Sequence, residues 1–360
     1  MAGTIEVHHF DAPPRAGLFS FSGARCVPWV VLTTAAALSL FSPDVTAYIA
    51  AWPFVVALVL MGMPHGAADW AVAARLRHRS GFIQQSLGFV PYLLMMLACL
   101  AALLLAPGIS ALAFLAMTVF HFGMADSTAL RADHDGAAAR WTLVTSRGLL
   151  LLATAFAAHP EAAWEPFGRI ATAMSPWHLT TWQPNLTTLQ GWATLGSASG
   201  AVLALTSAAL RTSRGHFREA ICDLSESALV VIIAMYGDPL FAVGIYFIGV
   251  HAFRHCRRLA RTRSVIEPPP QPAPFLQRML RVHALSLPLM VATAACLIPL
   301  CIVLGGFDLR SIAVASIAFY MISTLPHHLL GLELPADDAG DGREAACVVN
   351  ERAAVASAAT

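Results

Sequence analysis

The sequence predicts an all-α protein that crosses a membrane eight to ten times. Of its 360 residues, 57% are hydrophobic and 12% are charged, whereas soluble domains typically contain about 25% charged residues. The mean hydropathy is +0.65, and many apolar runs approach the roughly 20 residues with which a helix spans a bilayer. A soluble protein could not bury this much apolar surface, so we expect a polytopic helical bundle in a lipid bilayer.

Ten apolar segments account for the predicted spans. They lie at residues 27–43, 46–72, 86–106, 109–126, 141–158, 190–210, 219–236, 240–260, 279–304 and 310–332. We expect three parts in the chain, namely a polar N-terminal segment (1–26), a single transmembrane domain (27–333) and a polar, small-residue-rich tail (334–360) that is disordered. The N-terminal segment contains acidic residues, histidines and prolines, so it does not resemble a cleavable secretory signal.

Arginine-rich stretches predict how the segments are oriented, because the cytoplasmic loops of membrane proteins are enriched in Arg and Lys. With the N-terminus inside, the C-terminal tail and four such stretches fall on the same side, at 75–79, 131–140, 211–218 and 254–263. The opposite side receives tight turns and the stretch 159–189, where Trp164 and two other tryptophans suggest a segment lying at the membrane interface. We therefore expect a multi-pass protein of the cell inner membrane with both termini in the cytoplasm.

Composition also excludes several classes of function. The net charge is only +1, and no basic surface rich in aromatic residues is evident, so no nucleic-acid partner is expected. The chain has no lysine, which excludes a retinal-binding photoreceptor because retinal is attached there as a Schiff base to a lysine amine. Seven cysteines are scattered without a CxxC pair, so neither a disulfide framework nor a thiolate zinc site is predicted.

Four histidines lie inside apolar stretches, and these are the candidate functional residues: His65, His121, His251 and His255. Ionisable residues at membrane depth cost free energy and usually face the interior of the bundle at a functional site. The predicted topology places all four toward the cytoplasmic half. His251 and His255 are four residues apart, which puts both imidazoles on one helix face, about 6 Å apart along the axis.

This arrangement predicts a membrane-embedded metal site. Imidazole is a suitable ligand for iron, copper, zinc or nickel, and four imidazoles would leave positions open for dioxygen. A lone histidine in a membrane helix is more often a hydrogen-bonded core residue, but four on three segments at matched depth favour a metal site. The loop histidines His78 and His134 are not expected to take part.

Other residues near the histidines could complete the site. A histidine bound to a metal usually donates its other N–H group to an acceptor. Asp69 is four residues after His65 and lies on the same helix face, and Glu226 is a second candidate acceptor. Asp126 points away from His121, which favours a role at a helix end or between helices.

The walls of an apolar substrate pocket can also be predicted. Phe122, Tyr246 and Phe247 are the aromatic candidates for this lining, although ordinary core packing would explain them equally well. Glycines flank His65 and His121, and small residues allow membrane helices to approach closely. Such close packing would bring the histidine-bearing helices within reach of a single ion.

The histidine motifs carry a family resemblance. The strings MPHGAAD (63–69), FHFGMAD (120–126), YFIGVHAFRHCRRL (246–259) and LPHHL (325–329) resemble the four histidine motifs of the Brp/Blh family of membrane carotenoid oxygenases. They occur in the family order and cover most of the hydrophobic region. The sequence departs from the family pattern directly after the third histidine: the family has a serine at this position, and this chain has Ala252.

The resemblance implies a β-carotene 15,15'-dioxygenase, in which iron(II) and O₂ cleave the central double bond to give two molecules of retinal. The family ligands map onto His65, His121, His251 and His255, and His327 takes an outer-shell or substrate-pocket role. β-Carotene, O₂ and the lipid bilayer are then the partners, with possible functional coupling to a separate retinal-binding opsin.

Two other hypotheses for the function remain open. A membrane di-iron hydroxylase or desaturase needs roughly eight histidines in several HxxxH boxes, whereas only His251 and His255 form such a box. A non-enzymatic transporter, or an opsin-assembly factor with a structural metal, would use the same histidines without catalysis. Transporters often show broken helices and internal repeats, and the sequence shows neither.

Overall fold

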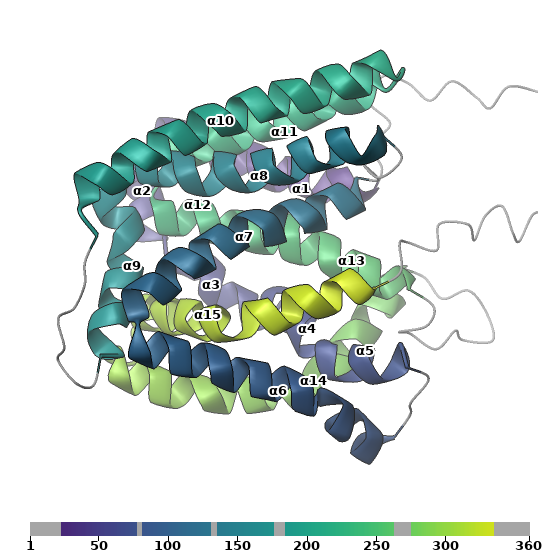
Figure 1. The fold of residues 1–360 in the computed structure, drawn as a ribbon, viewed down its shortest axis with the longest axis vertical. Coiled ribbons are helices and arrows are strands. Elements are labelled where there is room, and N and C mark those ends of the chain that lie inside the picture. The colour runs from purple at the N-terminus through teal and green to yellow at the C-terminus, as the bar shows by residue number, and fades with distance from the viewer. Residues whose placement is uncertain (1–22, 78–80, 131–134, 176–183, 263–274, 335–360) are drawn as a thin grey trace, which may run out of the picture.

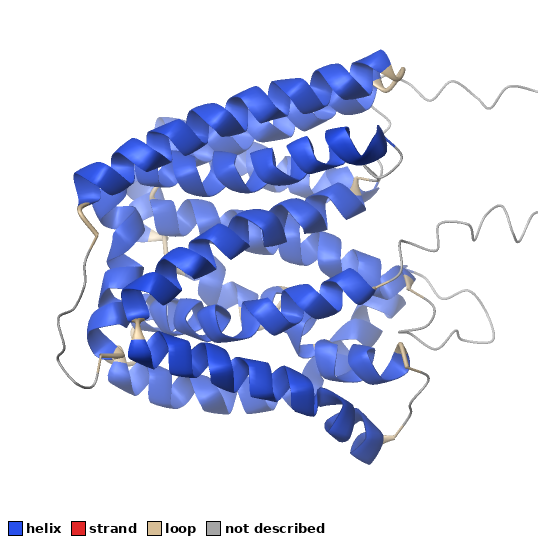
Figure 2. Ribbon diagram, in the orientation of Figure 1, coloured by secondary structure: helices blue, strands red, loops and turns tan. Residues whose placement is uncertain are grey.

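The computed structural model describes residues 23–77, 81–130, 135–175, 184–262 and 275–334, and these residues form an all-helical bundle without a strand (Figures 1 and 2). The loop histidines His78 and His134 lie outside the described residues, as does most of the predicted tail. The elements are α1 (Gly23–Phe41), α2 (Pro43–Tyr48), α3 (Trp52–Ala57), α4 (Gly62–Ala67), α5 (Asp69–Arg75), α6 (Phe82–Leu105), α7 (Pro107–Ala129), α8 (Gly136–Ala158), α9 (Pro160–Ala173), α10 (Leu186–Ser213), α11 (Phe217–Tyr236), α12 (Pro239–Tyr246), the π-helical turn η2 (Phe247–Ala252), α13 (Phe253–Arg261), α14 (Phe275–Val303) and α15 (Leu309–Glu333).

Six of the described helices are long and apolar enough to cross a membrane, namely α6, α7, α8, α10, α14 and α15. The shorter helix α1, helix α11 and the continuous rod formed by α12, η2 and α13 run alongside them (Figure 1). The protein is therefore an all-α, multi-pass membrane protein, as its composition predicts.

The predicted span at 46–72 does not form one helix. The chain there is divided into the four short helices α2, α3, α4 and α5. Pro43 and Pro53 occupy the first turns of α2 and α3, where a missing N–H group costs no helical hydrogen bond. Glycine and proline are poor residues for a helix interior, so MGMPHGA favours the break that brings His65 into the bundle.

Helix α9 lies across one end of the bundle, roughly perpendicular to the long helices (Figure 1). It occupies the first half of the stretch 159–189, which the tryptophans predicted to lie at the membrane interface. Trp164 is instead buried and packs near Phe167 in the hydrophobic core. The Trp164 ring is therefore covered by neighbouring helices and does not face lipid headgroups. The other two tryptophans lie outside the described residues, and the interfacial position of this segment stays a prediction.

Polar caps fix where several helices start. The Asp238 carboxylate accepts hydrogen bonds from the backbone N–H groups of Leu240 and Phe241 at the start of α12. Asp308 accepts in the same way from the N–H groups of Arg310 and Ser311 at the start of α15. These caps satisfy backbone donors that have no partner within the helix. They fix the first turns of α12, which leads into η2 and His251, and of α15, which carries His327.

Helices α7 and α8 cross at two glycines. A Cβ atom added at Gly123 would lie 1.9 Å from the Val144 carbonyl oxygen, and one added at Gly148 would lie 2.2 Å from that of Val119. Real Cβ atoms do not approach other atoms so closely, so only glycine allows the two backbones to make this contact. Gly123 therefore joins α7 to α8, which carries none of the predicted ligands. The expectation that glycine draws ligand-bearing elements together is met at Gly62 of α4, where an added Cβ atom would lie 2.8 Å from the Phe247 ring of η2.

Candidate metal centre and apolar cavity

His65 enters the site from the short helix α4. Its Nδ1 atom lies 3.1 Å from the carbonyl oxygen of Met61, and the whole residue is buried. A carbonyl oxygen can only accept a hydrogen bond, so Nδ1 carries the proton in this contact. The Nε2 atom of His65 therefore keeps a free lone pair, which is the form in which imidazole binds a metal.

His251 lies in η2, and His255 follows in α13. A single π-helical turn inside an α-helix is uncommon and is frequently found at functional sites. His251 is fully buried, and neither of its ring nitrogens has a hydrogen-bond partner; the Nε2 atom of His255 is likewise buried and without a partner. Buried polar atoms are nearly always hydrogen-bonded in folded proteins, so these nitrogens indicate the place of a ligand.

The four predicted histidines converge inside the bundle. The ring centroid of His65 is 5.3 Å from that of His251 and 5.3 Å from that of His255. The His121 and His251 centroids are 4.5 Å apart, and those of His251 and His255 are 6.4 Å apart. Three distant stretches of the sequence thus contribute imidazoles to one small volume.

His327 joins this group from α15. Its ring centroid lies 5.0 Å from that of His65, 5.2 Å from that of His121 and 5.2 Å from that of His255. One nitrogen from each of His65, His251 and His327 lies within 4.8 Å of the others, close enough to hold one metal ion. We call these five residues, His65, His121, His251, His255 and His327, the histidine cluster.

Asp69 contacts the cluster through His327, although the sequence pairs it with His65. The Nδ1 atom of His327 donates a hydrogen bond of 2.6 Å to the Asp69 carboxylate, and both side chains are buried. Helix α5 starts at Asp69, only four residues after His65, so the break between α4 and α5 turns this carboxylate toward α15. The predicted second-shell acceptor is present, but its partner is a different histidine.

Glu226 does not contact a histidine. Its carboxylate accepts hydrogen bonds from Arg254 at 2.8 and 3.0 Å, from Arg147 at 3.0 Å and from Arg25 at 3.3 Å. The expectation that Glu226 orients a metal-bound imidazole is therefore not met. The sequence does not show which carboxylate each arginine pairs with, because the three arginines come from helices far apart in the chain.

Glu226 belongs instead to a buried network of ion pairs that links α1, α7, α8, α10, α11 and α13. Its members are Arg25, Arg147, Arg211, Arg254, Asp126, Asp135, Asp223 and Glu226. We call these eight residues the ion-pair network. Four arginines face four carboxylates, so the formal charges of the network sum to zero.

Asp126 joins this network to the histidine cluster. Its carboxylate lies 2.8 Å from Arg254 and accepts a hydrogen bond of 2.7 Å from the Tyr246 hydroxyl. The expected role of Asp126 between helices is confirmed. The Phe122 ring fills the space between the two regions, 5.3 Å from the Tyr246 ring and 4.8 Å from the His251 ring.

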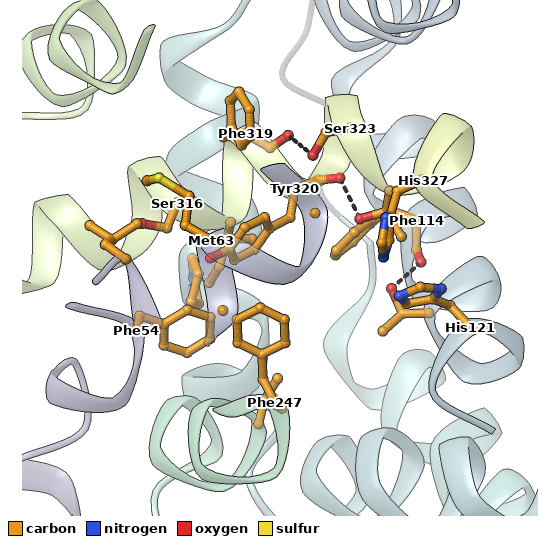
Figure 3. Close-up of a pocket in the computed structure, with 18 of the residues that line it drawn as sticks. Phe54, Met63, Phe114, His121, Phe247, Ser316, Phe319, Tyr320, Ser323 and His327 are labelled. Carbon is orange, nitrogen blue, oxygen red and sulfur yellow. Dashed lines mark hydrogen bonds between the residues drawn. The ribbon is translucent and has the colours of Figure 1, made fainter. Parts of the chain in front are cut away.

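An apolar cavity of about 240 Å³ opens beside the histidines (Figure 3). His65, His121 and His327 line one part of it, and Phe122 and Phe247 are among the aromatic residues of its wall. Tyr246, the third predicted aromatic residue, is not part of the lining and instead binds Asp126. The cavity also reaches helices α9, α12 and α14, and so extends away from the histidines across the bundle.

Most hydroxyl groups in the cavity wall are turned back to their own helices. Thr118 donates to the Phe114 carbonyl, Ser323 to that of Phe319 and Thr324 to that of Tyr320. The cavity therefore presents a surface that is largely apolar even where the sequence is polar. Such a surface suits an elongated hydrocarbon rather than a charged ligand.

Comparison with known proteins agrees with this geometry. Residues 56–334 match the family model described as beta-carotene 15,15'-dioxygenase. The chain is also 26% identical over 328 residues to a protein of Halobacterium salinarum named probable beta-carotene 15,15'-dioxygenase Blh, covering 84% of this chain and 90% of the relative. No solved structure matches the chain.

Proposed function

Because the chain belongs to the beta-carotene 15,15'-dioxygenase family, we propose that it cleaves the central double bond of β-carotene with O₂, using iron(II), and releases two molecules of retinal. The observation that carries this proposal is the meeting of the imidazoles at one part of a largely apolar cavity. A polyene dissolves in the bilayer, so its cleavage requires a site at membrane depth with an apolar wall.

The proposed ligands to iron are His65, His121, His251 and His255. The residues fit this metal because buried ring nitrogens of His251 and His255 lack any other partner, and because His65 keeps Nε2 free by donating from Nδ1. Imidazole suits iron as well as other transition metals. Bound iron would supply the binding and activation of O₂ beside the polyene.

The cavity residues account for the remaining part of the proposed reaction. Phe122 and Phe247 lie beside the histidines and would hold the polyene so that its central bond faces them. Positioning of this kind selects one bond among many similar ones. The central C=C bond breaks and two C=O bonds form, with both oxygen atoms coming from O₂, so no external reductant is consumed.

The same proposal includes the setting of the protein in the cell. We propose an inner-membrane location with both termini in the cytoplasm, on the basis of the arginine-rich ends of α5, α10 and α13. Retinal formed there would be available to a separate opsin, since this chain lacks the lysine needed to bind retinal covalently.

Expression in a bacterial host that accumulates β-carotene tests the activity directly. We expect the orange pigment to disappear and retinal to be the product, whereas cells carrying a His65→Ala variant should keep the pigment. Labelled ¹⁸O₂ should appear in the aldehyde oxygens, and products of other chain lengths would contradict central cleavage. Unchanged β-carotene in the presence of folded, iron-loaded protein would contradict the proposed activity.

A further inference from the structure

His327 differs from the other members of the histidine cluster in being held by a carboxylate. The Asp69 oxygen and the Nδ1 atom of His327 are 2.6 Å apart, which is the short distance expected of a hydrogen bond to a charged partner. The two side chains are only 4% and 7% exposed. Because a carboxylate oxygen accepts, Nδ1 carries the proton and the lone pair of His327 lies on Nε2.

That Nε2 atom is buried and has no hydrogen-bond partner. Leaving a buried acceptor unsatisfied costs on the order of 1–3 kcal/mol, and the same cost is met at His251, whose ring lies nearby in the cluster. Two imidazoles close together that lack hydrogen-bond partners, one of them held by a carboxylate, are the pattern expected of ligands to a shared metal ion.

We propose that His327 is a fifth protein ligand of the iron, and that Asp69 is the positioning residue that fixes its ring. This inference rests on the proposed iron site and extends it, since the motif resemblance gives His327 an outer role only. It is supported by the distances among the ligand atoms: those of His65, His251 and His327 lie within 4.8 Å of one another.

The surroundings of Asp69 support its positioning role. Gly66 lies in the turn before Asp69, and a Cβ atom there would come within 4.0 Å of the Nδ1 atom of His327. This is an ordinary van der Waals distance, so the His327 ring packs directly beside α4. Asp69 then links the start of α5 to α15, so it holds His327 at the level where His65 enters from α4.

The competing explanation is a structural hydrogen bond between α5 and α15 that involves no metal. The two explanations predict different results for a variant without ligand nitrogens. If His327 binds iron, its replacement weakens metal binding even in protein that is fully folded. If the pair is only structural, replacement lowers the melting temperature and leaves the affinity for metal unchanged.

The test uses the full-length protein purified in detergent and stripped of metal. Anaerobic titrations with Fe(II) measure affinity, titrations with Co(II) report the ligand set through visible absorption, and melting of the metal-free protein reports folding. For His327→Gln we expect at least a roughly 100-fold weaker affinity and an altered Co(II) spectrum. For Asp69→Asn, which keeps an oxygen acceptor, we expect a roughly 10- to 100-fold loss with a Co(II) spectrum close to that of the wild type.

His159→Gln is the matched control. His159 directly follows α8 and contacts the Met235 carbonyl oxygen, outside the histidine cluster, so this variant should keep the wild-type metal affinity and Co(II) spectrum. Wild-type affinity and spectrum in His327→Gln, or in Asp69→Asn if the first variant does not fold, would overturn the inference and leave the proposed function standing. A wild-type protein that binds neither Fe(II) nor Co(II) would overturn both proposals together.

Discussion

The histidine cluster and the ion-pair network lie side by side in the same apolar bundle, but they differ in whether their buried polar atoms have partners within the protein. In the network every charge has an opposite charge within 4 Å, and several side chains are fully buried without a loss of partners. In the cluster, ring nitrogens of His251, His255 and His327 are buried and have no hydrogen-bond partner. The difference separates a region that is complete in the protein alone from one that needs a ligand.

The comparison also explains how the cluster is held in place. Asp126 and His121 share α7, and Arg254 lies between His251 and His255 along the rod of η2 and α13. The pairing of Asp126 with Arg254 at 2.8 Å therefore fixes two histidine-bearing elements to each other. An ion pair outside the apolar cavity thus sets the distance between the His121 ring and the rings of His251 and His255.

The largest expected effect is the loss of iron and activity when a residue of the histidine cluster is replaced. His251→Leu removes two unsatisfied nitrogens and keeps the volume apolar, so metal-free protein should melt at the same temperature or higher. The same variant should lose bound iron and all β-carotene cleavage. Metal analysis, pigment extraction and thermal melting check this, with His78→Ala and His134→Ala as silent controls. A large fall in melting temperature would mean that His251 is a packing residue.

The next effect is on stability and belongs to the network. Glu226→Gln keeps the shape of the side chain but leaves Arg25, Arg147 and Arg254 without their shared countercharge. Breaking one partner of a buried ion pair costs about 3–5 kcal/mol, so little folded protein should be recovered from membranes. Glu165→Gln removes a partly exposed partner of Arg310 and should cost about 1 kcal/mol or less. Equal yields of the two variants would contradict the role given to Glu226.

A third effect concerns the crossing of α7 and α8. Gly123→Ala would force a methyl group against the Val144 carbonyl, and overpacking of this kind costs about 1–3 kcal/mol or more. The displaced α7 should also weaken iron binding, because His121 is two residues away. Gly191→Ala in α10 has no atom in its way and should be neutral or stabilising. Melting curves and iron titrations of both variants measure the contrast.

The smallest expected effect lies at the boundary between the regions. Tyr246→Phe removes the hydrogen bond to Asp126 and should cost about 1.5 kcal/mol, since Asp126 keeps its arginine partners. Tyr320→Phe removes a buried hydroxyl that has no partner, so its melting temperature should stay the same or rise. A greater loss of stability at Tyr320 than at Tyr246 would contradict the assignment of Tyr246 to the network.

Much of the fold followed from apolar run lengths, and the departures have physical causes. The segment 46–72 has the composition of a span, but composition does not show that Gly62 must contact Ala57 and Phe247 closely or that the chain breaks there. Trp164 was expected at the interface because its residue type is common there. Burial depends on which helices pack over it, and a single sequence does not supply that.

The meeting of the histidines was predictable from the sequence, but the partners of the nearby carboxylates were not. His65, His121, His251 and His255 could be placed at one level from the arginine-rich loops and the helical spacing. The pairing of Asp69 with His327 and of Glu226 with Arg254 depends on contacts between residues up to 258 positions apart. Arg147 does carry a signal in the sequence, because an arginine inside an apolar stretch needs a buried carboxylate nearby.

The neutral balance of the ion-pair network has a consequence for biosynthesis. Arg25 leaves the ribosome 201 residues ahead of its partner Glu226, and Arg147 also precedes it. Arg147 already has Asp126 of the preceding helix α7 within 3.7 Å. Arg25, in the first turn of α1, pairs instead with Asp223 and Glu226, so it meets these carboxylates only after α11 has been synthesised. The final packing of α1 therefore depends on a helix that is translated much later.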